Sequence, residues 1–160
     1  MGLWVPSIEI MKAIVEEERG KGKKIVFGNG CFDLIHVGHI RYLRAAKALG
    51  DILVIAVNDD ESLVSLGKRA SVITPLEERI EILAALTPVD YVIAFKEPTV
   101  ENLLKELKPH VHAKGTDYTA ETVPEREIVR AYGGEVAIVG DEKSHSTRDI
   151  IDLVRRMDSR

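Results

Sequence analysis

Residues 52–57 are the segment that most constrains how this chain can fold. They read Ile-Leu-Val-Ile-Ala-Val, a continuous apolar run that is rich in β-branched side chains. A strand with one face in water would alternate apolar and polar residues, whereas a strand covered on both faces is apolar throughout. The run therefore predicts a fully buried strand, of the kind found in parallel sheets with helices on both sides.

Short apolar runs and helical patterns alternate along the rest of the chain. We expect strands at residues 25–27, 52–57, 91–94, 111–113 and 135–139, and helices at residues 8–20, 37–49, 75–86, 99–107, 124–132 and 146–157. This alternation predicts an α/β fold: a Rossmann-like, mostly parallel five-stranded sheet with helices on both faces. The 160 residues suit a single domain, with an N-terminal helix within residues 1–22 and a core over residues 23–157.

Composition narrows the classes of partner. The net charge of -4 gives no general attraction for nucleic acid or for an anionic membrane, so we expect neither as a partner. Cys31 is the single cysteine, which excludes an intrachain disulfide. The N-terminus lacks the profile of a signal peptide, and the apolar runs are too short to span a bilayer. We therefore expect a cytoplasmic protein.

A glycine-rich turn between the first strand and the next helix carries two histidines, His36 and His39. Residues at i and i+3 share one face of a helix, so two ring N–H groups can converge on one anion at its N-terminus. An isolated pair of this kind is more often structural, with one ring capping the turn and the other on the surface. Gly30, Gly38 and a helix start near Val37 favour the anion site, because they offer close backbone approach and unpaired N–H groups.

Other interpretations of this turn are weaker. A zinc site lacks a third nearby ligand, and His110 with His112 is an unlikely second metal pair. A P-loop sequence does not occur, and Asp33 stands where a dinucleotide-binding turn needs its third glycine. Asp33 could contact a cation or a sugar hydroxyl, or it could bond its own backbone.

Two further polar segments follow predicted strands or begin a predicted helix. Lys114-Gly115-Thr116-Asp117-Tyr118 follows the fourth strand, and Ser144-His145-Ser146-Thr147-Arg148 begins the last helix. A cation, a flexible backbone point and helix N-terminal hydroxyls can hold phosphate oxygens. The structural alternatives are a solvated turn and ordinary N-capping.

Together these segments resemble the cytidylyltransferase-like nucleotidyltransferases. The family's His-x-Gly-His motif matches His36-Val37-Gly38-His39, and its Ser-Thr motif matches Ser146-Thr147. Within the family, the chain is most similar to the D-glycero-β-D-manno-heptose 1-phosphate adenylyltransferases. The segments that carry this likeness are Phe27-Gly28-Asn29-Gly30-Cys31-Phe32-Asp33, Arg41-Tyr42-Leu43, Val57-Asn58, Pro75-Leu76-Glu77-Glu78-Arg79, Lys114-Gly115-Thr116-Asp117-Tyr118 and Val129-Arg130-Ala131-Tyr132-Gly133-Gly134.

The resemblance implies an enzyme that transfers a nucleoside monophosphate from ATP to heptose 1-phosphate, giving ADP-heptose for lipopolysaccharide synthesis. One alternative is a CTP-dependent cytidylyltransferase acting on heptose 1-phosphate or glycerol 3-phosphate. A second alternative is a non-catalytic nucleotide-binding module. The family also implies Mg²⁺ bound with the triphosphate, and a homodimer.

The resemblance further implies a role for particular residues, with no metal ligand assigned to the protein itself. The implied catalytic residues are His36, His39 and Lys114. The implied nucleotide-binding residues are Gly30, Cys31, Phe32, His36, Gly38, His39, Lys114, Gly115, Asp117, Tyr118, Ser146 and Thr147. The implied substrate-binding residues are Asp33, Asn58, Asp60, Lys68, Arg69 and Arg79.

The chain departs from the family pattern at three places. Thr116 stands where the family usually has glycine, and Arg148 stands where it has a second threonine. Ser71-Val72 replaces an Arg-Pro pair, so Lys68 and Arg69 could supply the lost positive charge. These departures leave the choice between ATP and CTP, and the identity of the sugar or polyol phosphate, open.

Overall fold

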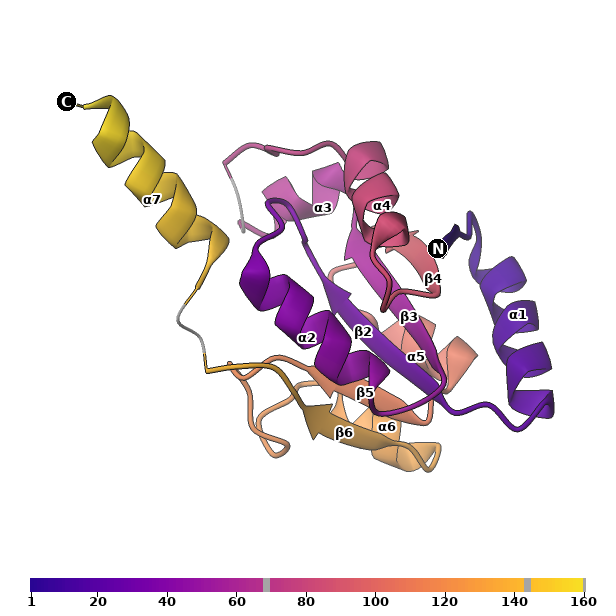
Figure 1. Ribbon diagram of the computed structural model, residues 1–160. Coiled ribbons are helices and arrows are strands. Elements are labelled where there is room, and N and C mark those ends of the chain that lie inside the picture. The colour runs from indigo at the N-terminus through magenta and orange to yellow at the C-terminus, as the bar shows by residue number, and fades with distance from the viewer. Residues whose placement is uncertain (68–69, 143–144, 160) are drawn as a thin grey trace.

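The computed structural model describes residues 1–67, 70–142 and 145–159. They form a six-stranded sheet in the order β1-β4-β3-β2-β5-β6, in which every neighbouring pair is parallel (Figure 1). The strands are β1 (Leu3–Trp4), β2 (Ile25–Gly30), β3 (Ile52–Asn58), β4 (Tyr91–Phe95), β5 (Val111–Lys114) and β6 (Glu135–Ile138). The predicted fold class, an α/β Rossmann-like parallel sheet, is confirmed.

Helices cover both faces of this sheet. The described helices are α1 (Ile8–Gly20), α2 (Val37–Lys47), α3 (Asp60–Ser65), α4 (Leu76–Ala85), α5 (Glu101–Leu107), α6 (Arg126–Ala131) and α7 (Thr147–Asp158), of which α7 projects away from the sheet (Figure 1). Two apolar cores result, one between the sheet and α1, α5 and α6, the other between the sheet and α2 and α4. Strand β3 contributes to both, since Val54 and Ala56 lie in the first core and Leu53, Ile55 and Val57 in the second. Burial on both faces confirms the prediction from the apolar run.

The structure has one strand more than the five that we predicted. Leu3 pairs with Tyr91 and Trp4 with Val92, which adds β1 to the edge of the sheet beside β4. A two-residue strand has no periodicity to detect, so the sequence pattern gave only the helix that follows it. The short helix α3 was also missed; it begins directly after β3, where the Asp59 carboxylate accepts a hydrogen bond from the Ser62 N–H at 2.8 Å.

Strand β2 extends beyond its predicted end because its glycines are part of the sheet. We expected Gly28 to stop the strand, yet β2 pairs with β3 as far as Gly30. A Cβ atom at Gly28 would overlap the hydroxyl of Tyr42, which donates to the Ala113 carbonyl at 2.7 Å. Glycine is required here so that an α2 side chain can cross β2 and reach β5.

The strand order places a change of direction beside β2. The chain passes from β2 to β3 and β4 on one side, and then returns to add β5 and β6 on the other. Ligands of open α/β sheets bind at the carboxyl ends of the strands where the order reverses.

Among the described helices, none has the length and apolar content needed to cross a bilayer. Helix α7 leaves the body of the molecule beyond the start of α2 (Figure 1).

The contact between Gly28 and Tyr42 predicts a non-additive pair of substitutions. Gly28→Ala should destabilise the fold by about 1–3 kcal/mol, because the added methyl overpacks against the hydroxyl. Tyr42→Phe should cost about 1 kcal/mol through the lost hydrogen bond. The double variant should be more stable than the sum of the two effects, as measured by denaturant unfolding.

Gly20→Ala is the matched control, since a Cβ atom there meets nothing within 4 Å. Its free energy of unfolding should stay close to that of the parent chain. Strict additivity of Gly28→Ala and Tyr42→Phe would show that the hydroxyl is not what excludes a side chain at position 28.

Candidate functional site

A cavity of about 370 Å³ opens at the carboxyl ends of β2, β5 and β6, between the N-termini of α2 and α7. Every residue that we predicted to bind a nucleotide lines it: Gly30, Cys31, Phe32, His36, Gly38, His39, Lys114, Gly115, Asp117, Tyr118, Ser146 and Thr147. These residues come from three separate stretches of the chain. The fold thus brings the three predicted segments to one place.

The two histidines cap helix α2. The Nδ1 atom of His36 accepts a hydrogen bond from the Gly38 N–H at 3.1 Å, and Nδ1 of His39 accepts one from the His36 N–H at 3.2 Å. An imidazole that accepts at Nδ1 carries its proton on Nε2 when it is neutral. The capping bonds therefore fix both rings in the tautomer that donates from Nε2. The structure shows the capping role that we considered, and both rings also line the cavity.

Neighbouring residues hold the two rings close to each other. The ring centroids of His36 and His39 are 4.0 Å apart, and the Phe32 ring packs 5.3 Å from that of His39. A Cβ atom at Gly38 would lie 2.8 Å from Cε1 of His36. We expected Gly38 to allow a ligand close to the backbone, but its first constraint is the space taken by the His36 ring.

The loops after β5 and β6 form the opposite wall. The ammonium of Lys114, the last residue of β5, lies 4.6 Å from the centroid of the Tyr118 ring. The Thr116 hydroxyl donates to the Asp141 carbonyl at 2.7 Å, and Arg41 of α2 pairs with the Asp141 carboxylate at 2.6 Å. Thr116, one of the departures from the family pattern, therefore joins the two loops that border the cavity.

The N-terminus of α7 closes the cavity on a third side. The Ser146 hydroxyl caps this helix by accepting from the Asp149 N–H at 3.1 Å. Thr147 is buried, and its hydroxyl donates to the Leu34 carbonyl at 2.9 Å, which ties α7 to the turn before α2. The first turn of α7 thus lines the same cavity as the two imidazole rings.

The residues predicted to bind the acceptor substrate are placed differently from our expectation. Asp33, Asn58, Asp60 and Arg79 are not among the cavity-lining residues, while Lys68 and Arg69 lie outside the described residues. The Asp33 side chain is buried and accepts hydrogen bonds from the N–H groups of Ile73 and Thr74. Asp33 therefore bonds backbone, but that of a distant segment of the chain rather than that of its own turn.

Arg79 is buried and binds the protein's own backbone; it is not an exposed residue that could bind substrate. It has no exposed area, and Nη1 donates to the carbonyl oxygens of Cys31 and Asn58, both at 2.7 Å. Its Nε donates to the Thr74 carbonyl at 2.9 Å, and its Nη2 pairs with the Asp60 carboxylate at 2.6 Å. The guanidinium holds the backbone at the end of the glycine-rich turn through these hydrogen bonds. We therefore correct the role that we expected for Arg79, which was to bind the acceptor substrate.

Several residues of the cavity wall were absent from our prediction: Asn29, Tyr42, Thr116, Val139, Gly140, Asp141, Glu142 and His145. Asn29 stands between Gly28 and Gly30, within a segment that carries the family resemblance, so it could have been included. The segment after β6 includes the acidic residues Asp141 and Glu142, but it belongs to none of the segments that carry the family resemblance. Its Gly140 has a φ of 99°, a conformation that glycine adopts without strain.

His112 lies behind the cavity in strand β5. Its Nε2 is 3.0 Å from the Asn29 side-chain oxygen, and its Nδ1 has no hydrogen-bond partner among the described residues. Burial, with a smaller contribution from the Lys114 ammonium, lowers the pKa of His112 to about 3. The other member of the sequence pair, His110, accepts from the Ile25 N–H at 2.9 Å. No group of three or more metal-ligating side chains is found within residues 1–67, 70–142 and 145–159.

The neutral state of His112 predicts a specific pH dependence of stability. The unfolded chain binds a proton at this residue below a pH of about 6.5, whereas the folded chain does so only near 3, so stability is lost as the pH falls through this window. Between pH 7 and pH 5 the loss from His112 should be about 2 kcal/mol. His112→Gln should remove this part of the slope in urea unfolding, while the exposed His145→Gln should leave it unchanged. Equal slopes in the parent chain and His112→Gln would contradict the buried neutral state.

Comparison with known proteins gives the family of this chain. The sequence model of the cytidylyltransferase-like family matches residues 27–157. The bifunctional protein HldE of Pelobacter propionicus is 46% identical over 146 residues, which cover 91% of this chain and 30% of that protein. HldE of Geobacter metallireducens is 45% identical, and HldE of Azotobacter vinelandii 43%, each over 95% of this chain. The chain spans about a third of the length of these curated relatives.

Solved structures show the same fold. The lipopolysaccharide core biosynthesis protein from Thermoplasma volcanium has a TM-score of 0.65 and 28% identity, and covers 76% of this chain and 100% of its own. Pantoate-β-alanine ligase from Francisella tularensis has a TM-score of 0.64 over 97% of this chain and 77% of its own, at 17% identity. With the family match over residues 27–157 and identities of 43–46% to several relatives, this chain belongs to the cytidylyltransferase-like family.

Proposed function

We propose that this chain is a nucleotidyltransferase domain that transfers the adenylyl group of ATP to heptose 1-phosphate, releasing pyrophosphate. The observation that carries the proposal is the pair of imidazoles, His36 and His39, held by their Nδ1 atoms at the start of α2 and lining one cavity with Lys114. That cavity also receives the N-terminus of α7. Two helix N-termini, two ring donors and one cation form a site suited to a polyphosphate.

The histidines would act as hydrogen-bond donors in this reaction. A phosphate oxygen of the sugar phosphate attacks the α-phosphorus, a new P–O bond forms, and the bond to the β-phosphate bridging oxygen breaks, with its electron pair leaving on pyrophosphate. Because the attacking phosphate is already ionised, no general base is needed. Negative charge builds up on the α-phosphoryl oxygens, and donors placed in advance at that point lower the barrier. Nε2–H of His36 and His39 and the ammonium of Lys114 are the donors that we assign to this charge.

Ser146 and Thr147 are assigned to the outer phosphates. The Thr147 hydroxyl hydrogen is used on the Leu34 carbonyl, so the contribution of this first turn would come from its backbone N–H groups. Lys68 and Arg69 stay sequence-based candidates for the acceptor phosphate.

Magnesium belongs to the proposal as an ion carried by the triphosphate. The described cavity wall contains Asp117, Asp141 and Glu142, but no described group of three side chains is arranged to hold a metal by itself. Mg²⁺ commonly binds through substrate phosphates and water with one or two carboxylates, and this wall fits that pattern. When bound, the ion would neutralise charge on the β- and γ-phosphates as pyrophosphate leaves.

The heptose substrate is supported by the relatives and by the narrow motifs. The relatives named HldE match over more than nine tenths of the chain, and the Thermoplasma volcanium neighbour is titled a lipopolysaccharide core biosynthesis protein. The stretch from Lys114 to Tyr118, by which the chain resembles heptose 1-phosphate adenylyltransferases, forms one wall of the cavity. We further propose that ATP is the nucleotide donor. We also propose that the protein is located in the cytoplasm, where nucleoside triphosphates are made.

CTP is the alternative nucleotide. The matching family is named for cytidylyltransferases, and Thr116 places a side chain and a hydrogen bond to Asp141 where the family usually has glycine. The corresponding acceptors would be heptose 1-phosphate or glycerol 3-phosphate. We also propose that the chain forms a homodimer, because apolar side chains of α7 are exposed.

Pyrophosphate release tests these functions against each other. The chain should be assayed with ATP, CTP, GTP and UTP, each with heptose 1-phosphates or glycerol 3-phosphate. We expect the highest kcat/KM with ATP and a heptose 1-phosphate. Preference for CTP would support the alternative enzyme, and triphosphate binding without turnover in any combination would support a non-catalytic module.

The donor role of His39 can be separated from its capping role. In His39→Asn, the side-chain oxygen can replace Nδ1 as the acceptor for the His36 N–H, but the Nε2 donor is lost. We expect His39→Asn and His39→Ala to lose about 10² to 10³ in kcat, or about 2.7 to 4 kcal/mol of transition-state stabilisation. His39→Asn should keep the thermal unfolding midpoint of the parent chain, because its cap is retained.

His110→Ala is the matched control for these variants, since His110 lies outside the cavity wall. Its kcat should match that of the parent chain. Normal turnover in folded His39→Asn would refute the donor role, and a loss of activity that follows only the loss of folded protein would leave His39 as a cap alone.

A further inference from the structure

Helix α7 presents an apolar face that its own domain does not cover. Leu153, Val154 and Met157 are 53%, 58% and 67% exposed, and Ile150 and Ile151 are partly exposed. The spacing i, i+3, i+4, i+7 from Ile150 to Met157 puts four of these side chains on one stripe. Figure 1 shows the helix projecting from the body, and within the described part of the chain no other helix or strand packs extensively against it.

An isolated helix of this length is not stable in water. α7 has 12 residues, and helices shorter than about 12–15 residues are marginal on their own even with favourable sequences. Its described attachments to the body are at the first turn, where Thr147 is buried and bonded to the Leu34 carbonyl. The helix therefore needs a partner along its apolar stripe.

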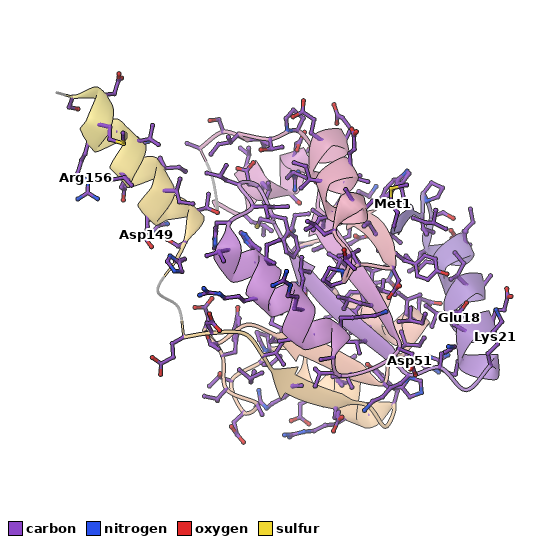
Figure 2. All side chains as sticks on the ribbon, in the orientation of Figure 1. Met1, Glu18, Lys21, Asp51, Asp149 and Arg156 are labelled. Atoms are coloured by element: carbon purple, nitrogen blue, oxygen red, sulfur yellow. The ribbon has the colours of Figure 1, made fainter. Side chains whose placement is uncertain are left out.

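The charges beside the stripe indicate which partner fits. Asp149 lies in the first turn and Arg156 in the last, and Figure 2 shows them near opposite ends of α7. Seven residues make almost two full turns, so both lie on the same flank of the stripe. When two identical helices pair antiparallel about a two-fold axis, the same flanks face each other. Asp149 of one copy then meets Arg156 of the other, and the contact is repeated on the far side of the axis.

The polar face argues against a membrane surface as the partner. Arg148, Arg155 and Arg156 are balanced by Asp149, Asp152 and Asp158. Membrane-binding amphipathic helices carry an excess of lysine and arginine on the polar face. A balanced face with acid at one end and base at the other complements a second copy of itself.

We propose that α7 pairs antiparallel with α7 of a second copy, through the stripe from Ile150 to Met157 and two Asp149–Arg156 ion pairs. A contact between single helices lies at the low end of interface sizes, so we expect dissociation at about micromolar concentrations. Because Ser146 and Thr147 line the cavity, the pairing also steadies one wall of it. This second consequence rests on the proposed function, since it concerns triphosphate binding.

Charge reversal tests the geometry of the pair. Asp149→Arg alone and Arg156→Asp alone should each weaken the dimer in sedimentation velocity at low salt, because each places like charges opposite each other. The double variant should recover the dimer. Both changes oppose the dipole of the isolated helix, so recovery has to come from contact between copies. Failure of the double variant to recover, with helix content retained by circular dichroism, would overturn the antiparallel arrangement.

Apolar substitutions test the surface. Leu153→Asp should give a folded monomer, while Ile10→Asp, on the half-exposed surface of α1, should leave the dimer intact. A parent chain that is monomeric at all concentrations, a Leu153→Asp variant that stays dimeric, or a dimer lost through Ile10→Asp would each overturn the proposal. Binding of the parent chain to anionic phospholipid vesicles, abolished by Leu153→Asp, would overturn it in favour of a membrane.

Kinetics test the coupling to the cavity separately. Leu153→Asp should raise the KM for the triphosphate by about fivefold or more, the lower end of the usual coupling between two sites. An unchanged KM in the monomer would overturn the coupling and leave the pairing in place. A dimer that transfers no nucleotide to any acceptor would instead overturn the proposed function alone.

Discussion

The reciprocal hydrogen bonds at the start of α2 determine the arrangement of the candidate site. Helix N-termini are usually capped by the oxygens of serine, threonine, aspartate or asparagine, which end at the backbone that they bind. Here the caps are ring nitrogens, and each ring carries a second nitrogen on its opposite side. By accepting from the backbone, His36 and His39 present that second nitrogen in a fixed direction and as a donor. Gly38 leaves room for the His36 ring, and Phe32 supports the His39 ring.

The wall of the cavity was largely predictable, because its residues stand at strand ends. In a parallel sheet, every polar segment that directly follows a strand arrives at the same edge. The glycine-rich turn after β2 and the Lys114 segment after β5 could therefore be brought together without knowing a distance. The capping segment of α7 was assigned to the same site only from the family motif, because it does not directly follow a strand. Residues 139–142 also follow a strand directly, and Asp141 and Glu142 are acidic, so the same rule reaches them; they were missed because they belong to none of the segments that carry the family resemblance.

The supporting residues were not predictable in the same way. Arg79 lies on α4 with an ordinary charged neighbourhood in the sequence, and a charged residue on an amphipathic helix is normally solvated. Its burial depends on two carbonyl groups, that of Cys31 directly after β2 and that of Asn58 at the end of β3. Strand β1 was missed for a related reason. Its two residues form a strand only by pairing with β4, which is distant in the sequence. Helix α7 was predicted from its cap and its stripe, but the sequence does not say whether the stripe faces its own domain.

Asp33 and Arg79 together hold Thr74 from both sides of its peptide, one through the N–H and the other through the carbonyl. The backbone is thereby clamped to the glycine-rich turn from Ile73 onward. The stretch between α3 and this clamp can change in sequence or length without moving the histidines, since the clamp absorbs the difference. Under the proposed function, in which Lys68 and Arg69 are sequence-based candidates for the acceptor phosphate, exchanging this stretch would change acceptor preference and leave the two capping histidines unaltered.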